Sequence, residues 1–303
     1  MILKPLAPRP GDRVGVIAPA GPVKPEELDA GLDRLASFGL TPVPGAHLYD
    51  ALAYTAGPDA ARLEDLHDMF ARPEIRAVFC ARGGYGCLRL LSLIDFHLIE
   101  SNPKLIMGFS DITSLLWGLQ ARTGLVSVHG PVVKTLTRDG GRAVELLFDW
   151  AREPGRPPEI DLSSDGRVLR PGRASGTVFG GNLSLVVHLM GTGFLPDLSG
   201  ALLFLEETRE PVYRIDRMLT HLAMNGVFDR IAGLLVGDFD GIGDVTASVP
   251  DLFMEKVGSA GIPVVAGLPV GHGERNLPLP IGLKATLDTE RMRLTYRESC
   301  FSG

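Results

Sequence analysis

The chain has 303 residues, of which 45% are hydrophobic and 22% are charged, proportions that are ordinary for a globular protein with one large core or two medium ones. Its formal net charge of -6 gives no basic field that would collect phosphates, so nucleic acid is not expected as the main partner. The cysteines, Cys80, Cys87 and Cys300, are an odd number without C-x-x-C spacing, which argues against a disulfide framework and a structural zinc site.

The N-terminal segment and the apolar runs bear on the location of the protein. Residues 1–13 carry charges and prolines and lack the apolar core of a signal peptide. The apolar runs are far shorter than the roughly 20 residues that cross a bilayer. We therefore expect a cytoplasmic protein without a membrane segment.

The first half of the chain has the pattern of a parallel sheet covered by helices, because short apolar runs alternate with longer amphipathic stretches. Buried strands are predicted over residues 14–18, 77–81, 105–109 and 126–129, and helices are predicted over residues 25–37 and 59–71. We interpret residues 1–136 as an N-terminal α/β domain with a flavodoxin-like or Rossmann-like parallel sheet.

The second half begins after a segment rich in glycine and proline, residues 137–173, which we interpret as the domain connection. Beyond it the sequence predicts strands over 201–205, 231–236 and 264–266, a helix over 212–224, and a terminal hairpin formed by 285–287 and 292–296. Residues 174–303 are therefore expected to form a smaller C-terminal α/β domain.

Ser110 stands where a predicted buried strand passes into an amphipathic helix with no loop between them. A serine on such a sharp turn projects its hydroxyl above the sheet edge, and the N–H of Asp111 points to where an oxyanion would develop. The pattern departs from G-x-S-x-G, because Ile112 occupies the second glycine position. The alternative interpretation is a helix N-cap, in which the Ser110 side chain bonds the N–H of Thr113.

A glycine-rich segment, residues 82–86, follows another strand of the same predicted sheet, at the carboxyl end where open α/β sheets bind ligands. Backbone N–H groups can approach a substrate there without a Cβ in the way, so Gly83 or Gly84 could supply a second oxyanion donor. The segment lacks the G-x-G-x-x-G and G-K-[ST] patterns of phosphate cradles. The alternative is a tight turn that only needs positive φ.

A serine nucleophile needs a positioned base, which is usually a histidine. Among the seven histidines, His272 lies in a loop rich in glycine and proline, which is typical of a segment that presents residues to a ligand. His129, at the end of a predicted strand, is less easily dismissed than the others.

A carboxylate that orients the base is expected from Glu206 or Glu207, which end an apolar strand, so that one of them should be half buried. The alternative is a salt bridge to a nearby arginine, namely Arg209, Arg214 or Arg217.

Six blocks of the sequence occur in one order over nearly the whole chain: residues 10–21, 81–86, 108–113, 179–183, 203–219 and 271–282. Together they resemble the LD-carboxypeptidase family, also called muramoyltetrapeptide carboxypeptidases. The resemblance implies hydrolysis of the amide between the L-centre of a diamino acid and a terminal D-alanine in peptidoglycan tetrapeptides, a cytoplasmic step of murein recycling. It further implies a muropeptide as the small-molecule substrate, no metal or organic cofactor, and a homodimer.

The resemblance implies a triad at the domain interface. Ser110 is its nucleophile in the first domain, and His272 as base and Glu206 as orienter come from the second, with Glu207 as the minor alternative. The oxyanion would rest on the N–H groups of Asp111 and of Gly84 or Gly83. Recognition of the substrate's terminal carboxylate is expected from Arg82 or Asn182, by charge or by hydrogen bonding.

Three rival functions are compatible with the residues. A microcin C immunity-type peptidase would act on aminoacyl or peptidyl adenylates with the same triad, although the relatives of that kind tend to have longer insertions. A non-catalytic module would bind a cell-wall fragment while Ser110 only caps its helix. A nucleotide-binding protein is the third, and equilibrium binding of ATP or NAD would support it.

Overall fold

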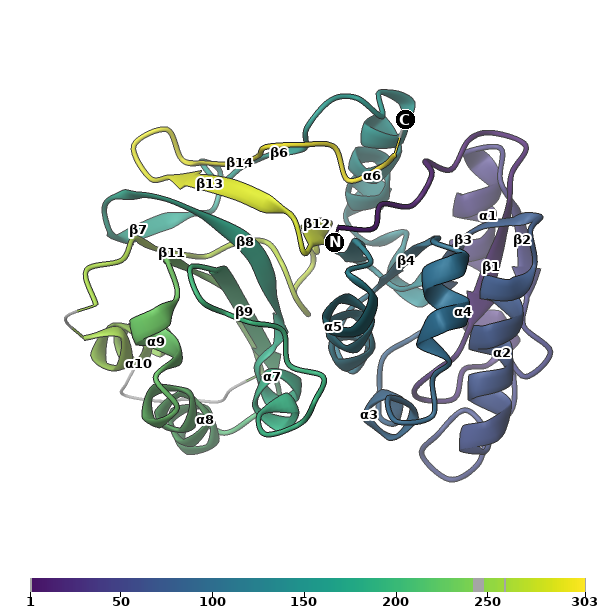
Figure 1. Ribbon diagram of the computed structural model, residues 1–303, viewed down its shortest axis with the longest axis horizontal. Helices are drawn as coiled ribbons and strands as arrows, with labels where there is room; N and C mark the ends of the chain where they lie inside the picture. Colours follow the sequence, from purple (N-terminus) through teal and green to yellow (C-terminus); the bar gives the residue numbers. More distant parts are fainter. Residues whose placement is uncertain (1, 242–247, 259, 303) are drawn as a thin grey trace.

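The computed structural model describes residues 2–241, 248–258 and 260–302 and contains two β-sheets, one in each half of the chain. Figure 1 shows the first sheet and its helices on the right and the second sheet on the left. The mixed α/β architecture with a parallel N-terminal sheet confirms the predicted fold class.

The first sheet has the strand order β12-β5-β4-β3-β1-β2, in which β1 to β5 are parallel. This is the 2-1-3-4-5 order of a flavodoxin-like sheet, whose ligands bind at the carboxyl ends of the strands. The strands are β1 (Arg13–Ile17), β2 (Thr41–Pro44), β3 (Ile75–Cys80), β4 (Leu105–Gly108) and β5 (Ser127–His129). The helices between them are α1 (Asp29–Ser37), α2 (Asp59–Ala71), α3 (Cys87–Leu90), α4 (Phe96–Ser101) and α5 (Ile112–Thr123).

The last strand of the first sheet, β12 (Leu279–Ile281), comes from the far end of the sequence. It pairs antiparallel with β5, and Leu279 lies opposite His129. This pairing has no local signal in the sequence, because the Leu-Pro-Leu-Pro run around β12 is typical of a loop. The chain therefore returns to the first half of the molecule directly after the loop that carries His272.

The second sheet has the order β6-β14-β13-β8-β9-β10-β11-β7. Its parallel centre consists of β8 (Arg173–Asn182), β9 (Leu202–Thr208), β10 (Gly233–Asp240) and β11 (Val264–Ala266), and the predicted hairpin is present as β13 (Lys284–Asp288) and β14 (Arg293–Tyr296). The segment interpreted as a connection holds α6 (Arg142–Arg152) and the two edge strands β6 (Glu159–Asp161) and β7 (Arg167–Arg170).

Four helices accompany the second sheet: α7 (Leu183–Leu189), α8 (Val212–Met224), α9 (Val227–Arg230) and α10 (Val249–Val257). Figure 1 shows them gathered on one side of it. The helices of the described residues lack the combination of length and apolar character that crossing a bilayer requires.

Helix α5 joins the two halves, since it packs against both α7 and β8. The indole Nε1 of Trp117 donates to the Gly180 carbonyl at 2.7 Å, and the N–H of Asn182 donates to Thr113 Oγ1 at 3.1 Å. A Cβ at Gly181 would lie 2.5 Å from Thr113 Oγ1, so only a glycine allows this close approach. The start of α5, where Ser110 is found, is thereby held against the second sheet.

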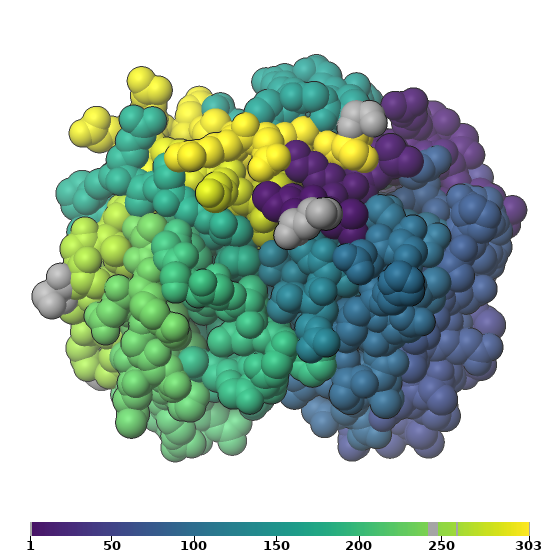
Figure 2. All heavy atoms as spheres, viewed as in Figure 1, coloured from purple at the N-terminus to yellow at the C-terminus, as the bar shows by residue number. Residues whose placement is uncertain are grey.

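The two ends of the chain also lie together. Leu6 forms a parallel bridge with Ser302, and the N–H of Ser302 donates to the Pro5 carbonyl at 2.8 Å. In Figure 2 the purple N-terminal residues accordingly run beside the yellow C-terminal segment. The contacts of Pro5 and Leu6 with Ser302 thus add a second connection between the halves.

Candidate active site

Ser110 occupies a strained turn between β4 and α5. Its φ of 64° lies in the left-handed region, which costs an ordinary residue about 1–2 kcal/mol. A Cβ at Gly108 would lie 2.9 Å from the Ile112 side chain, so the strand can end this close to the helix only at a glycine. The predicted sharp turn is therefore present, with the backbone strain that is found in nucleophile elbows.

The Ser110 side chain does not cap α5. The N-cap position belongs to Asp111, and the N–H of Thr113 bonds to the main-chain carbonyl of Ser110 at 2.9 Å. Asp111 instead uses its buried carboxylate to accept the N–H of Cys87 at 2.8 Å, which ties the helix start to the glycine-rich segment. The hydroxyl of Ser110 is consequently not used by the fold among the described residues.

The glycine-rich segment stands directly beside the serine. A Cβ at Gly83 would lie 2.7 Å from Ser110 Cβ and 3.0 Å from Ser110 Oγ. Gly84 has a φ of 123°, and the Gly83 carbonyl accepts the N–H of Gly21 at 3.1 Å, which fixes the segment against the loop after β1. Glycine is required at both positions, at the first by space and at the second by its conformation.

His272 and Glu206 form a hydrogen-bonded pair. Nδ1 of His272 lies 2.7 Å from Oε2 of Glu206, whose side chain is fully buried at the end of β9. A Cβ at Gly271 would lie 2.8 Å from the same oxygen, so a glycine before His272 lets the loop come this close. The ring of Phe109, the residue before Ser110, packs on the His272 ring with centroids 4.8 Å apart.

Opposing influences set the pKa of His272. Burial is the largest single influence and lowers it, but the hydrogen bond to Glu206 and the charges of Glu206 and Glu207 raise it, and the resulting pKa is above the usual 6.5. Burial raises the pKa of Glu206, an effect that the hydrogen bond with His272 opposes. A partner that stabilises the imidazolium suits a base that must hold a proton during catalysis.

Glu207 serves the fold rather than the imidazole. Its carboxylate accepts the side-chain amide of Asn182 at 2.8 Å, the N–H and hydroxyl of Ser184 at 2.9 and 2.6 Å, and the N–H of Thr208 at 2.9 Å. Neither glutamate forms a salt bridge to an arginine among the described residues. The two neighbouring carboxylates therefore have different partners, and the histidine belongs to Glu206.

Asn182 lies beside the two glutamates, opposite Glu206 in the β8–β9 pairing, but it does not line the cavity described below that holds Ser110 and His272. Its side chain is buried, donates to Glu207, and accepts the N–H of Leu185 as the N-cap of α7. Because these contacts use its amide within the protein, the structure gives no support to contact between Asn182 and a substrate carboxylate.

His129 lies behind the site. Its ring is fully buried between Phe109 and Phe204, with centroid distances of 6.0 and 5.0 Å, and its nitrogens have no hydrogen-bond partner among the described residues. Burial lowers the pKa of His129 to about 3. The ring is therefore kept neutral and does not line the cavity with Ser110, whereas the His272 ring is partly exposed there.

Ser110 and His272 line one cavity of about 440 Å³, together with Gly83 and Gly84. The hydrogen bonds of the described residues include the one between His272 and Glu206 but none between Ser110 Oγ and His272. Nucleophile–base contacts are often long without substrate, so a shared cavity is the relevant geometry. Within the described residues, no three His, Cys, Asp or Glu side chains are grouped so that they could hold a metal ion.

Cationic side chains surround the same cavity. Arg82 is one of them and is held by a 2.8 Å hydrogen bond from its guanidinium to the Pro22 carbonyl. The others, which were not predicted as site residues, are Lys134, Arg138 and Arg209, and Asp240 adds one negative charge. Each of the three comes after a parallel strand, β5 or β9, in the sequence. A position after the carboxyl end of such a strand was the sequence feature that could have indicated a site residue. Such a cluster suits a substrate carboxylate.

Comparisons with known proteins give consistent results. Residues 14–130 match the LD-carboxypeptidase N-terminal domain and residues 175–287 the LD-carboxypeptidase C-terminal domain. The chain is 40% identical to the probable murein peptide carboxypeptidase of Bacillus subtilis (strain 168), over 94% of this chain and 92% of the relative. It is 34% identical to the murein tetrapeptide carboxypeptidase of Pseudomonas aeruginosa, over 93% and 94% of the two chains.

A solved structure of an MccF-like protein from Bacillus anthracis has a TM-score of 0.88 and 26% identity, and the match covers 98% of this chain and 99% of that one. The first domain match contains Ser110, and the second contains Glu206 and His272. Because the two domain matches together cover most of the chain and both relatives align over more than 90% of it, this chain belongs to the LD-carboxypeptidase family.

Proposed function

We propose that this protein is a serine carboxypeptidase that releases the terminal D-alanine from peptidoglycan tetrapeptides by hydrolysing an L,D-amide bond. The observation that carries the proposal is the strained serine that shares one cavity with His272, whose ring is hydrogen-bonded to the buried Glu206. The names of the two relatives, a murein peptide and a murein tetrapeptide carboxypeptidase, support this class of substrate.

In the proposed mechanism, Ser110 Oγ attacks the scissile carbonyl while Nε2 of His272 takes the hydroxyl proton. Glu206 holds the other ring nitrogen, which fixes the tautomer and stabilises the imidazolium. The tetrahedral intermediate collapses as His272 gives the proton to the leaving amine, and D-alanine departs. Water then attacks the acyl-enzyme with the same base, which restores Ser110 and frees the tripeptide acid.

Backbone N–H groups are proposed to stabilise the oxyanion. Those of Asp111, Gly83 and Gly84 lie beside Ser110 and have no protein acceptor among the described residues. An oxyanion donor is typically worth about 3 kcal/mol of the barrier. Asp111 at the helix start is the first donor, and Gly83 or Gly84 is the second.

The cations of the cavity are proposed to bind the free carboxylate of the substrate. We assign this role to Arg82, as predicted, and also to Arg138 and Arg209, because they line the same cavity. A guanidinium fork matches a carboxylate in shape and charge, which an exopeptidase needs in order to select a chain end.

The direct test is incubation of the protein with a panel of tetrapeptides, followed by mass measurement of the products. We expect loss of one alanine from peptides that end in D-alanine on an L-centre. A matched peptide ending in L-alanine and a pentapeptide ending in D-Ala-D-Ala serve as controls and should stay intact. Tetrapeptides left uncut by a protein that still binds them would instead favour a non-catalytic module.

The second candidate is a microcin C immunity-type peptidase. It is supported by the similarity to the MccF-like structure, because MccF is the microcin C7 self-immunity protein of Escherichia coli. Hydrolysis of an aminoacyl adenylate analogue together with inactivity on tetrapeptides would favour this function. The higher identity to the two murein carboxypeptidases makes it the weaker proposal.

The pH dependence of the reaction follows from His272. The neutral ring accepts the proton, and its pKa is raised above 6.5, so the inactive imidazolium persists to higher pH than for an ordinary histidine. We therefore expect kcat/KM to rise with pH through one acid limb whose midpoint is above 6.5. A profile measured over about pH 5 to 9 checks this, and a midpoint near the usual carboxyl value of about 4 would assign the base to another group.

We further propose that the protein acts in the cytoplasm and as a homodimer, as the family resemblance implies. Sedimentation velocity of the purified protein tests the second part, since a monomer at all concentrations would contradict it.

A further inference from the structure

Strand β10 is irregular where it passes the catalytic loop. Its pairing with β9 shifts register between Val236 and Phe239, so Gly237 and Asp238 leave the regular ladder. An extra residue of this kind bends a strand and redirects its side chains, often beside an active site. Here the irregularity turns Asp238 toward the loop that carries His272.

Asp238 contacts the loop on both sides of His272. Its N–H donates to the carbonyl of Val270 at 2.9 Å, and its carboxylate oxygen Oδ2 accepts the N–H of Gly273 at 3.2 Å. A Cβ at Gly273 would lie 2.4 Å from that oxygen, so the glycine permits the close approach. Asp238, a residue of the second sheet, is thus hydrogen-bonded to the loop both before and after His272.

We propose that Asp238 is a positioning residue for the reaction, because its carboxylate fixes Gly273 and so aims the His272 ring between Glu206 and Ser110. The inference rests on the proposed function and adds a residue to its machinery without placing that residue in contact with substrate.

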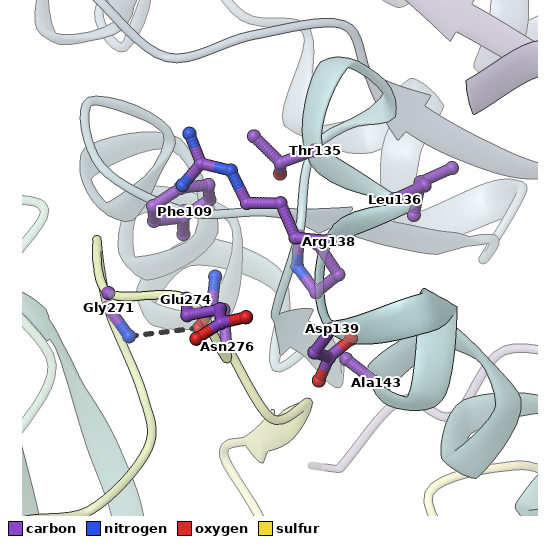
Figure 3. A pocket seen from close by; sticks show the side chains of 11 residues that line it. Phe109, Thr135, Leu136, Arg138, Asp139, Ala143, Gly271, Glu274 and Asn276 are labelled. Atoms are coloured by element: carbon purple, nitrogen blue, oxygen red, sulfur yellow. Dashed lines mark hydrogen bonds between the residues drawn. The ribbon is translucent and has the colours of Figure 1, made fainter. Parts of the chain in front are cut away.

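The other anchors of the loop cannot replace this contact. The N–H of Gly271 donates to the side-chain oxygen of Asn276 at 3.0 Å, but both residues belong to the loop itself, as Figure 3 shows. Arg138 reaches the His272 carbonyl only at 3.5 Å and from an exposed side chain. Arg275 forms an ion pair with Asp165, between β6 and β7, but it lies three residues from the base, and its side chain is partly exposed. The carboxylate of Asp238 is therefore the contact with the second sheet that lies nearest to His272 on its C-terminal side among these anchors.

The carboxylate of Asp238 is a usable acceptor at neutral pH, although its surroundings raise its pKa. Burial raises its pKa to about 6, and the charges of Glu206 and Asp240 act in the same direction. The hydrogen bond from Gly273 and the charge of Arg275 oppose the shift. At pH 8 the group is ionised, so kinetics measured there compare the carboxylate with its replacements.

The test compares Asp238→Ala with Asp238→Asn at pH 8. Alanine removes the acceptor, whereas the side-chain oxygen of asparagine can still accept the Gly273 N–H. Because a misplacement of about 1 Å can cost about 100-fold in rate, we expect Asp238→Ala to lower kcat by about 30-fold to 100-fold. KM should stay within about twofold, and Asp238→Asn should recover kcat to within about threefold of the wild type.

Two measurements separate positioning from a general structural defect. In the Ser110→Ala background, Asp238→Ala should leave the Kd for tetrapeptide unchanged, since binding does not need the aimed base. Asp197→Ala is the matched control, because its carboxylate also accepts a backbone N–H, that of Ser199 at 2.9 Å, outside the cavity. It should retain the wild-type kcat.

An active wild type with an equally active Asp238→Ala variant would overturn the inference, and so would an Asn variant as defective as the Ala variant. Failure of the proposed function has a different signature, which is a wild type that releases no D-alanine at all.

Discussion

Replacement of Ser110 by alanine is expected to reduce D-alanine release by about 10⁶-fold, the scale of loss seen when a serine peptidase loses its nucleophile. The turn that holds the residue already has a left-handed conformation, and alanine has the same Cβ as serine, so the backbone has no new reason to move. The hydroxyl makes no hydrogen bond to the fold among the described residues, and its removal should leave thermal stability nearly unchanged.

The decisive measurements are the single-turnover rate of D-alanine release and the Kd for tetrapeptide. Ser110→Ala should keep the Kd within about threefold, because binding depends on the cations and the backbone of the cavity. Ser127→Ala is the matched control, since Ser127 is buried on the neighbouring strand β5 and does not line the cavity. Release that persists in the Ser110 variant at a tenth of the wild-type rate or more would remove serine from the mechanism.

The adjacent glutamates provide the second large effect. Glu206→Gln is expected to lower kcat by about 10⁴-fold, because the amide no longer selects the right imidazole tautomer or stabilises the imidazolium. The same variant removes the charge of Glu206 and the hydrogen bond of its carboxylate, which are the main influences that raise the pKa of His272. The acid limb of the residual activity should therefore move to lower pH.

Glu207→Gln is the matched control, as a neighbouring buried carboxylate whose partners are Asn182, Ser184 and Thr208. It should cost about 1–3 kcal/mol of stability, because buried donors lose their acceptor. The acid limb should move to lower pH by less than in Glu206→Gln, because only the charge of Glu207, and no hydrogen bond, raises the pKa of His272. Urea unfolding and kcat measured on both variants decide the assignment. An inactive but stable Glu207 variant beside an active Glu206 variant would reverse the roles of the two residues.

The sequence predicted the elements whose signals are local. The amphipathic helices α2 and α8 begin and end where the sequence predicted, with Pro58 and Pro211 at their N-cap positions, and the short strand β11 has its predicted bounds. Strands β6, β7 and β12 were not predicted, because each has three or four residues and is defined by a partner that is distant in the sequence. Strands β2 and β8 were also not predicted, because the prolines of the first and the glycines of the second are typical of turns. The predicted helix over 25–37 is divided into a 3-10 turn, Pro25–Glu27, and α1.

The site was predictable in its chemistry but not in its layout. The strand-to-helix transition at Ser110 indicated a sharp turn, but only the fold shows a φ of 64° and the serine beside Gly83. The sequence could not decide between Glu206 and Glu207 without the resemblance, since both end the same strand. Arg209 is far from Lys134 and Arg138 in the chain, and three-dimensional packing alone brings it to the cavity that they line.

The return of the chain to the first sheet has a mechanical consequence. Residues 273–278 are all that separates His272, whose imidazole is tied to Glu206 of the second sheet, from β12 in the first. If the two halves separate, this short segment moves His272 away from Ser110 before either half loses its own hydrogen bonds. Turnover should therefore vanish at a lower denaturant concentration than secondary structure does. Activity would then measure whether the two halves are docked.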